Sequence, residues 1–154
     1  MIKIGVIADT HGHLDRQVLE IFAGVDHILH AGDIGLPALI LELEDVAPVT
    51  AVLGNADVGL DFKETAILEL GGRKFLVHHL VDISSPDEAL QRRILRERPD
   101  VVVFGHTHKR CCEMMGETLF FNPGYAGKRK SEHLRSVAIL NCDDDGISAD
   151  YFEL

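Results

Sequence analysis

The sequence is poor in basic residues and has no long hydrophobic run, and each shortage excludes a class of protein. Only 15 Lys and Arg stand against 25 Asp and Glu, which leaves a net charge of −10 over 154 residues. Nucleic acid is bound through clustered Lys and Arg that release counterions, so this balance argues against a nucleic acid polymer and favours a small substrate. No segment approaches the ~18 apolar residues of a membrane-spanning helix, and the apolar run before Asp9 is too short for a signal peptide. We therefore expect neither export nor a membrane partner, and we leave a homo-oligomer open.

Cysteine is also scarce, and its three positions form no disulfide framework. Cys111 and Cys112 are adjacent, Cys142 is isolated, and there is no CxxC motif. This usage is typical of a reducing compartment, so a cytoplasmic location is expected. Cys111 or Cys112 could in principle act as a nucleophile, but their alternation within a predicted strand favours packed structural thiols.

Three common catalytic signatures are missing as well. There is no GxxxxGK[ST] phosphate loop, no GxSxG elbow and no HExxH zinc motif, and the segment 32–35 is too short for a dinucleotide fingerprint. Repeats, low-complexity tracts and linkers are absent too, which predicts one domain over residues 1–154. A chain of this length buries roughly 68–70% of its unfolded surface, so any metal it binds is expected to be functional rather than structural.

Hydrophobic periodicity predicts alternating strands and helices in the first half of the chain and hairpins in the second. The predicted early strands are Lys3–Ile7, His27–His30, Val49–Leu53 and Arg73–His78. The predicted helices cover Leu14–Phe22, Leu36–Leu43 and a segment that begins with Ser85 as N-cap and runs towards Arg96. The predicted later strands are Val101–Phe104, Arg110–Met115, Thr118–Asn122, Ser136–Cys142 and Gly146–Phe152. This order indicates an α/β fold with a mixed sheet or two packed sheets flanked by helices.

Polar side chains of a restricted kind follow five of these predicted strands. They are Asp9, His11, Asp33, Asn55, His78, His106 and His108. A single polar residue at such a place is more often a turn residue, but seven that are all imidazole, carboxylate or amide form the set that binds divalent metals. The carboxyl ends of strands are also where α/β sheets bind ligands. Residues two apart in an extended segment point to the same side, so Asp9 with His11, and His106 with His108, could each converge on one point.

Two glycines strengthen this prediction. Gly32 precedes Asp33 and Gly54 precedes Asn55, which is consistent with a sharp turn or a close backbone approach at a crowded centre. Seven ligands are more than one octahedral ion takes from protein while leaving room for substrate. Two metal ions that share one bridging carboxylate use them better.

The ordered series Asp9-x-His11, Gly32-Asp33, Gly54-Asn55, His78 and Gly105-His106-Thr107-His108 resembles the calcineurin-like metallophosphoesterase superfamily. It is most similar to the small bacterial and archaeal phosphodiesterase branch, and Asn122-Pro123-Gly124 also matches that branch. The resemblance spans nearly the whole chain. It implies a four-layer α-β-β-α sandwich, in which two mixed β-sheets are flanked by helices.

The resemblance also implies a ligand set. The first metal would be held by Asp9, His11, Asp33 and His108. The second would be held by Asp33, Asn55, His78 and His106, with His79 as the alternative to its neighbour His78. Imidazole, carboxylate and amide donors without a thiolate suit Mn best, with Ni, Fe or Zn as alternatives.

The implied activity is that of a metal-dependent phosphodiesterase that hydrolyses small phosphodiesters with a hydroxide bridging two metal ions. Asp33 is then the bridging carboxylate, and the Asn55 amide also reaches the substrate phosphate. His30 is a candidate for orienting the ligands, with a merely buried histidine as the equal alternative. Lys128 and Arg129 could contact a phosphate, although a solvated basic run is the simpler interpretation.

Some positions depart from the family pattern. Ala56 stands where larger phosphatases of the family carry a histidine proposed as general acid, although the small branch often lacks it too. The general acid is thus open, with His13, His79 and His133 as candidates. Tyr125 replaces the small residue usual after Asn-Pro-Gly. Because the superfamily includes a scaffold subunit of a membrane-trafficking coat, the alternative is a non-catalytic interaction module that retains the fold.

Overall fold

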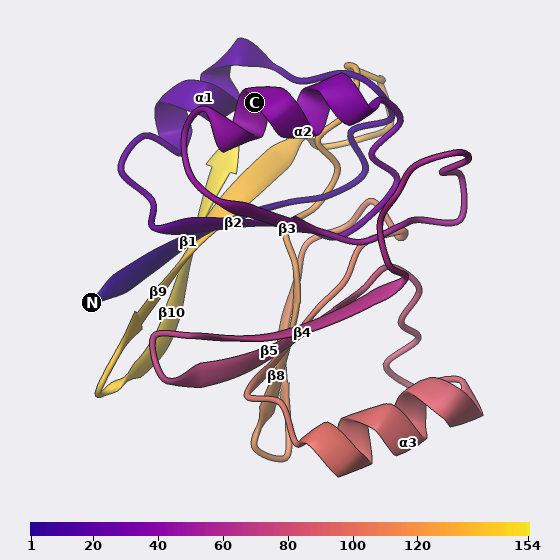
Figure 1. The fold of residues 1–154 in the computed structure, drawn as a ribbon, viewed down its shortest axis with the longest axis vertical. Coiled ribbons are helices and arrows are strands. Elements are labelled where there is room, and N and C mark those ends of the chain that lie inside the picture. The colour runs from indigo at the N-terminus through magenta and orange to yellow at the C-terminus, as the bar shows by residue number, and fades with distance from the viewer.

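Two five-stranded mixed sheets face each other in the computed structural model, which describes residues 1–154 (Figure 1). The first sheet has the order β10-β9-β1-β2-β3. Its strands are β1 (Ile2–Ile7), β2 (His27–His30), β3 (Val49–Ala51), β9 (Ser136–Asp143) and β10 (Gly146–Glu153). β1, β2 and β3 are parallel, whereas β9 and β10 form an antiparallel hairpin beside β1.

The second sheet has the order β4-β5-β6-β8-β7. Its strands are β4 (Thr65–Leu70), β5 (Arg73–His78), β6 (Val101–Val103), β7 (Cys111–Met115) and β8 (Thr118–Asn122). The central three, β5, β6 and β8, are parallel, and the two edge strands are antiparallel to their neighbours. Each sheet therefore has parallel strands whose carboxyl ends share one edge.

Helices cover the two outer faces, so that the molecule has four layers (Figure 1). α1 (Arg16–Ile21) and α2 (Pro37–Glu44) pack on the first sheet, and α3 (Glu88–Glu97) packs on the second. Side chains alternate accordingly: Val6 in β1 faces the space between the sheets and Ile7 faces the helices. The predicted four-layer sandwich is confirmed.

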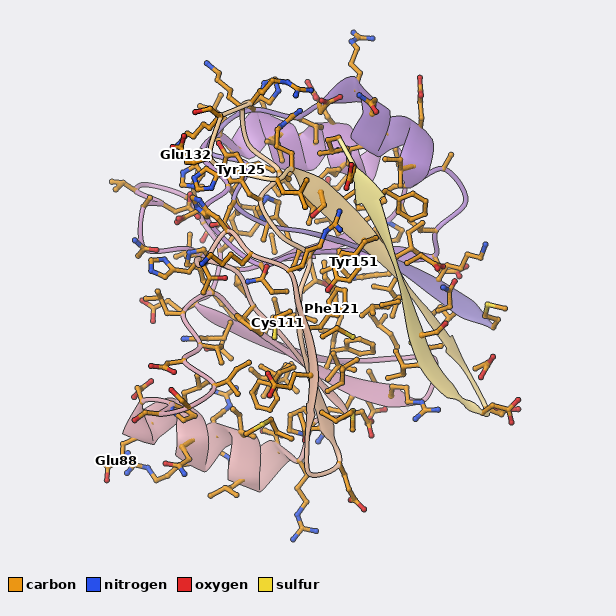
Figure 2. The ribbon with its side chains drawn as sticks, turned by 180° about the vertical axis from the view of Figure 1, so that it is seen from behind. Glu88, Cys111, Phe121, Tyr125, Glu132 and Tyr151 are labelled. Carbon is orange, nitrogen blue, oxygen red and sulfur yellow. The ribbon has the colours of Figure 1, made fainter.

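The space between the sheets is filled by aliphatic side chains and by a stacked aromatic pair. Fourteen buried residues form this core, most of them Val, Ile, Leu and Ala. The Phe121 ring from β8 stacks on the Tyr151 ring from β10 at 5.4 Å between centroids, where the two sheets approach (Figure 2). This layer extends up to the strand ends, so the side chains that follow those strands start from a rigid base.

Every predicted element is present, with the ends of several shifted by one or two residues, and two differences concern what forms an element or starts it. β4 is an additional strand, paired in antiparallel register with β5. α3 begins later than predicted, because its N-cap is Asp87, whose carboxylate accepts a hydrogen bond of 2.9 Å from the Ala89 backbone N–H. Ser85 lies outside the helix, in a loop where Asp82 accepts the hydrogen bonds of Ser84. No helix in the structure is both long and apolar enough to cross a membrane.

Candidate metal centre

Four loops meet where the parallel strands of both sheets end, and they bring six ionisable side chains into two groups. The first group is Asp9, His11 and His108, and the second is Asp33, His79 and His106. Within each group the potential ligand atoms lie within 4.8 Å of one another. Asp9, His11 and Asp33 follow strands of the first sheet. His79, His106 and His108 follow strands of the second sheet, so the centre lies between the sheets.

Asp9 presents one carboxylate oxygen to this centre. Its Oδ2 accepts a 3.0 Å hydrogen bond from the His106 backbone N–H. Its Oδ1 is buried without any hydrogen-bond partner and lies 3.6 Å from His108 Nε2 and 3.9 Å from His11 Nε2. A buried oxygen without a partner is unfavourable unless a cation occupies the space in front of it.

Asp33 is arranged in the same way and lies between the two groups. Its Oδ1 accepts a 2.9 Å hydrogen bond from the Ala56 backbone N–H. Its Oδ2 lies 3.3 Å from His79 Nε2 and 3.7 Å from His11 Nε2, so it faces one histidine of each group. Asp9 Oδ1 also lies 3.8 Å from His79 Nε2, so both carboxylates face histidines of both groups, and Asp33 Oδ2 is the closer of the two to His11 and His79.

The structure places His79, the predicted alternative to His78, in the second group. Side chains alternate along β5, so that Phe75 and Val77 face the other sheet while His78 shares its face with Leu76. His78 is turned to the edge strand β4, where its Nδ1 lies 2.8 Å from the Thr65 hydroxyl. His79, which follows the strand, is 2% exposed and points between the sheets.

The tautomer of His79 is fixed by its surroundings. Its Nδ1 donates a 2.7 Å hydrogen bond to the Ala31 carbonyl, which leaves the lone pair on Nε2. This Nε2 is buried and has no hydrogen-bond partner. Burial also lowers the pKa of His79, which keeps the imidazole neutral. A neutral imidazole held by a backbone carbonyl is typical of a metal ligand.

His106 and His108 do not converge on one point, contrary to the expectation from their spacing. His108 joins Asp9 and His11, whereas His106 joins Asp33 and His79. The backbone is not extended here: both residues have positive φ, 72° and 60°. Asn55 lies beside His106, with its Oδ1 3.0 Å from His106 Nδ1. The division agrees with the ligand sets that the family resemblance implies.

Left-handed backbone is concentrated at this centre. Only six non-glycine residues in the chain have positive φ, and five of them are Asp9, His11, Asp33, His106 and His108. The sixth, Arg98, ends α3 as its C-cap. Each such conformation costs about 1–3 kcal/mol and is kept where the surrounding structure enforces it, commonly at functional sites. Sequence spacing gives no signal of it.

Gly54 brings its backbone close to the Asp33 carboxylate, as expected at a crowded centre. A Cβ built on Gly54 would overlap the Asp33 backbone nitrogen and Oδ1, and would lie 2.7 Å from its Cγ. A Cβ on Gly32 would lie 2.7 Å from His79 Nδ1. Any larger residue at either position would therefore displace a side chain of the centre.

His30 positions the loops rather than joining the centre. The Gly32 N–H donates to His30 Nδ1 at 3.2 Å, and His30 Nε2 lies 2.9 Å from the Thr10 hydroxyl, which donates to the Ile34 carbonyl at 2.9 Å. Burial lowers the pKa of His30 to about 3, so the imidazole is neutral and this chain of bonds is satisfied. It ties the loop of Asp9 and His11 to the loop of Asp33.

Two further positioning residues were not singled out from the sequence. The Asp57 carboxylate accepts hydrogen bonds from the backbone N–H groups of Ile34, Gly35 and Gly54 at 2.9–3.1 Å. The buried Asn122 side chain donates to the Gly105 carbonyl and to the Thr107 hydroxyl, both at 3.1 Å. Asp57 holds the loop of Asp33, and Asn122 holds the loop of His106 and His108. The only signal was their place in Gly-Asn-Ala-Asp and Asn-Pro-Gly.

Of the candidate general acids, His133 lies beside the centre. Its ring centroid is 4.9 Å from that of His108, and its Nε2 is 3.4 Å from His108 Nδ1. Tyr125, labelled in Figure 2, packs against both rings, and its centroid lies 4.7 Å from that of His108 and 4.8 Å from that of His133. His79 is excluded as an acid by its place in the second group. Lys128 and Arg129 are exposed, as expected for a solvated run.

The charge at the centre fits a cation. Burial and the nearby charge of Asp33 raise the pKa of Asp9 to about 7, because two carboxylates are held together away from water. Burial lowers the pKa of His108 to about 4, so its imidazole is neutral at neutral pH. Two free carboxylate oxygens facing neutral imidazoles, with no thiolate, are the donors of borderline and hard divalent ions. The residues present therefore fit the metal that the sequence predicted.

Comparison with known proteins gives three consistent findings. Residues 2–145 match the family model described as the calcineurin-like phosphoesterase superfamily domain. A probable metallophosphoesterase of Methanothermobacter thermautotrophicus is 32% identical over 155 residues, covering 96% of this chain and 90% of that protein. A solved archaeal phosphodiesterase superposes with a TM-score of 0.81 at 28% identity, over 99% of this chain and 100% of that one.

The fold is shared with Vps29 as well. Vps29 of Entamoeba histolytica, solved in complex with Zn²⁺, superposes with a TM-score of 0.78 at 21% identity and covers 99% of both chains. At this identity the likeness concerns the fold alone.

Proposed function

The chain belongs to the calcineurin-like phosphoesterase superfamily, a family of metal-dependent phosphoesterases, and from this premise we propose that it hydrolyses small phosphodiesters at a centre of two divalent metal ions. The observation that carries the proposal is the matched pair of carboxylates. In both Asp9 and Asp33, one oxygen accepts a backbone N–H and the other is left facing imidazole nitrogens. Two carboxylate oxygens held in this way are oriented to bind cations, and no other role for them is evident.

The proposed ligands follow from the two groups. One ion is held by Asp9, His11, Asp33 and His108, and the other by Asp33, Asn55, His79 and His106. We assign the shared role to Asp33, since its Oδ2 lies closer to His11 and His79, at 3.7 and 3.3 Å, than Asp9 Oδ1 does, at 3.9 and 3.8 Å. When bound, the ions supply Lewis-acid polarisation of the phosphoryl oxygens and a water activated at neutral pH.

Groups of the protein itself orient the ligand side chains and hold the substrate phosphate. The Ala31 carbonyl keeps the Nε2 of His79 unprotonated, and the backbone N–H of His106 aligns the Asp9 carboxylate. The exposed Asn55 amide is placed to reach the substrate phosphate as well as an ion. Position 56 carries only a methyl group, so it cannot protonate a departing alkoxide. Diesters with good leaving groups are therefore the expected substrates.

The donor set suits Mn²⁺ first, with Ni, Fe or Zn as alternatives. We place the enzyme in the cytoplasm, in keeping with a chain whose three cysteines are all free thiols.

The test is turnover of bis(4-nitrophenyl) phosphate with added Mn²⁺, against the same protein in EDTA. The Asp33→Ala variant should lose activity and both ions, because one carboxylate serves two sites. Asp144→Ala, which removes an exposed carboxylate in the β9–β10 turn, is the matched control and should keep both. Full metal content and turnover in Asp33→Ala would refute the shared ligand.

The second candidate function is a non-catalytic scaffold, which the likeness to Vps29 and the methyl group of Ala56 favour. Because Vps29 itself is known in complex with Zn²⁺, metal binding alone does not separate the two functions. Turnover does. We favour the enzyme because competent ligands occupy every position of both groups.

A further inference from the structure

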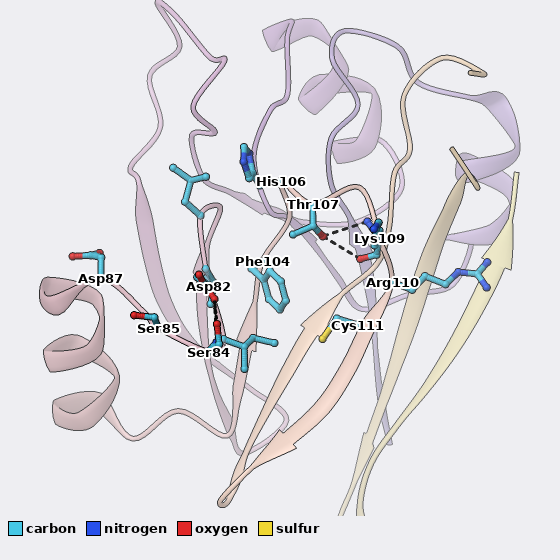
Figure 3. Close-up of a pocket in the computed structure, with 13 residues that line it drawn as sticks. Asp82, Ser84, Ser85, Asp87, Phe104, His106, Thr107, Lys109, Arg110 and Cys111 are labelled. Atoms are coloured by element: carbon cyan, nitrogen blue, oxygen red, sulfur yellow. Dashed lines mark hydrogen bonds between the residues drawn. The ribbon is translucent and has the colours of Figure 1, made fainter. Parts of the chain in front are cut away.

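A cavity of about 760 Å³ opens beside the candidate metal centre (Figure 3). It lies between the loop 80–87, which precedes α3, and the segment 104–111, which follows β6. His106 belongs to both the cavity lining and the second ligand group. A phosphate held at the centre would therefore direct one of its substituents towards this cavity. Nothing in the ligand sets or in the proposed mechanism uses the rest of its lining.

We propose that this cavity binds one ester substituent of the substrate, and that the substituent is an uncharged ring system, either an aryl or a nucleoside group. The proposal rests on the phosphodiesterase function proposed above and adds the substrate class to it. Three properties of the cavity carry the inference: its size, its floor and its charge.

The size matches a ring-bearing group. Pockets for small molecules have volumes of about 300–1,000 Å³, and this cavity lies well within that range. A methyl or ethyl ester would leave most of it to water. The volume therefore favours a substituent with at least one ring.

The floor is apolar. Leu80 is 47% exposed and Ile83 is half-buried, so both offer apolar surface to a bound group, whereas Val81 and Phe104, at 7% and 2% exposure, offer little. The Phe104 ring lies between the two segments (Figure 3). Burying a flat apolar group against Leu80 and Ile83 is favourable by about 25 cal/mol per Å² of apolar surface removed from water.

The charges at the rim oppose a second anionic group. Asp82 and Asp87 lie on the side formed by the loop 80–87, and hydrogen bonds from Ser84 keep the pKa of Asp82 below its usual range. Lys109 lies on the opposite side. Arg110 is turned away, with its guanidinium 4.8 Å from the Tyr151 ring and its Nε bound to the Ser136 hydroxyl. A phosphorylated substituent would thus face two carboxylates and a single lysine.

The first experiment observes the cavity without using activity. ¹⁵N-labelled protein loaded with Zn²⁺ is titrated with adenosine, with benzyl alcohol and with ribose, and amide shifts are followed by NMR. Saturable shifts at residues 80–87 and 104–111 are expected with the ring compounds and not with ribose. The adenosine and benzyl alcohol arms separate a nucleoside from a simple aryl preference. Shifts that are absent there, or equal with ribose, would overturn the proposal.

The second experiment compares phenylphosphonate with methylphosphonate as inhibitors of bis(4-nitrophenyl) phosphate turnover. They share one anionic head and differ by the ring. Burying the ring, after the losses that accompany binding, should make phenylphosphonate on the order of tenfold tighter in the wild type. Ser85→Trp, which places an indole in the cavity, should remove this difference. Inhibition by inorganic phosphate should stay unchanged, because Ser85 touches no ligand.

Ser148→Trp is the matched control, since it adds the same side chain at an exposed position on β10. Ile83→Ala tests the floor if Ser85→Trp does not fold, and it should reduce the ring preference. A preference that persists in both Ser85→Trp and Ile83→Ala would overturn the cavity assignment. Turnover without any ring preference would overturn this inference alone. Ring binding at the cavity in a protein that turns over no diester would overturn the proposed function instead.

Discussion

Replacing Gly54 with alanine should damage the metal centre more than the fold. The added Cβ would overlap the backbone nitrogen and Oδ1 of Asp33. Asp33 cannot retreat freely, because its Oδ1 accepts the Ala56 N–H and its carbonyl accepts the His11 N–H, each at 2.9 Å. Either the loop of Gly54 or the shared carboxylate must therefore move.

The magnitude follows from two known effects. Forcing one extra carbon into a packed site typically costs about 1–3 kcal/mol. In a protein of this size each kcal/mol lowers Tm by about 2–4 °C, so the metal-free variant should melt roughly 2–12 °C below the wild type. Disturbing a group that positions a ligand typically weakens metal binding by about 10–100-fold, and both ions should be affected because Asp33 is shared.

The assay is calorimetric titration of metal-stripped protein with Mn²⁺, together with melting in EDTA. Gly24→Ala is the control: a Cβ there meets nothing within 4 Å, but φ is +88°, so the variant should lose stability through backbone strain while binding metal normally. If Gly54→Ala took up two ions with wild-type affinity, the reasoning that this contact positions the Asp33 carboxylate would be refuted.

Three other outcomes are expected. His79→Ala should lose the second ion, as measured by metal analysis, whereas His78→Ala should retain both, and the reverse result would restore His78 as the ligand. The pKa of His30 is about 3 in the folded chain and about 6.5 in the unfolded chain. Below pH 6.5 the unfolded chain therefore binds a proton that the folded chain does not bind. In urea melts of metal-stripped protein, the stability advantage over His30→Gln should therefore fall by up to about 1.4 kcal/mol per pH unit from 6.5 towards 3, and a constant difference would contradict the neutral imidazole. Ala56→His should flatten the dependence of log kcat on leaving-group pKa, since a placed acid contributes about 10²–10⁴-fold, and equal slopes at equal metal content would show that position 56 does not face the leaving group.

The sequence predicted the fold well where periodicity and family pattern agree. The boundaries of β2, β5 and β8 match the predicted ranges, because their ends are marked by turns or by loss of alternation. β4 was missed, since its residues are half-buried and mix Glu69 into an aliphatic run, a pattern that helix and edge strand share. Pairing with β5 settles its conformation, and pairing is a tertiary contact that spacing does not report.

For the site, the types of the ligand residues could be predicted from the sequence, but the directions in which their side chains point could not. The series of Asp, His and Asn at strand ends located the centre, but the choice between His78 and His79 depends on where β5 stops alternating. The grouping of His106 and His108 depends on positive φ at both, which a tight loop imposes. Asp57 escaped notice because its task is to bind backbone N–H groups from two loops that meet only in the folded chain.

The left-handed backbone at the centre also bears on how this fold could change over evolution. Five residues held at positive φ, at about 1–3 kcal/mol each, together cost on the order of 5–15 kcal/mol, which is comparable to the whole net stability of an ordinary domain. Glycine at Asp9, His11 or Asp33 would relieve that cost and remove a ligand in the same step. Any descendant of this chain released from catalysis is therefore expected to gain stability as its ligands are replaced by glycine. A chain that keeps all five residues keeps them at a cost in the free energy of folding.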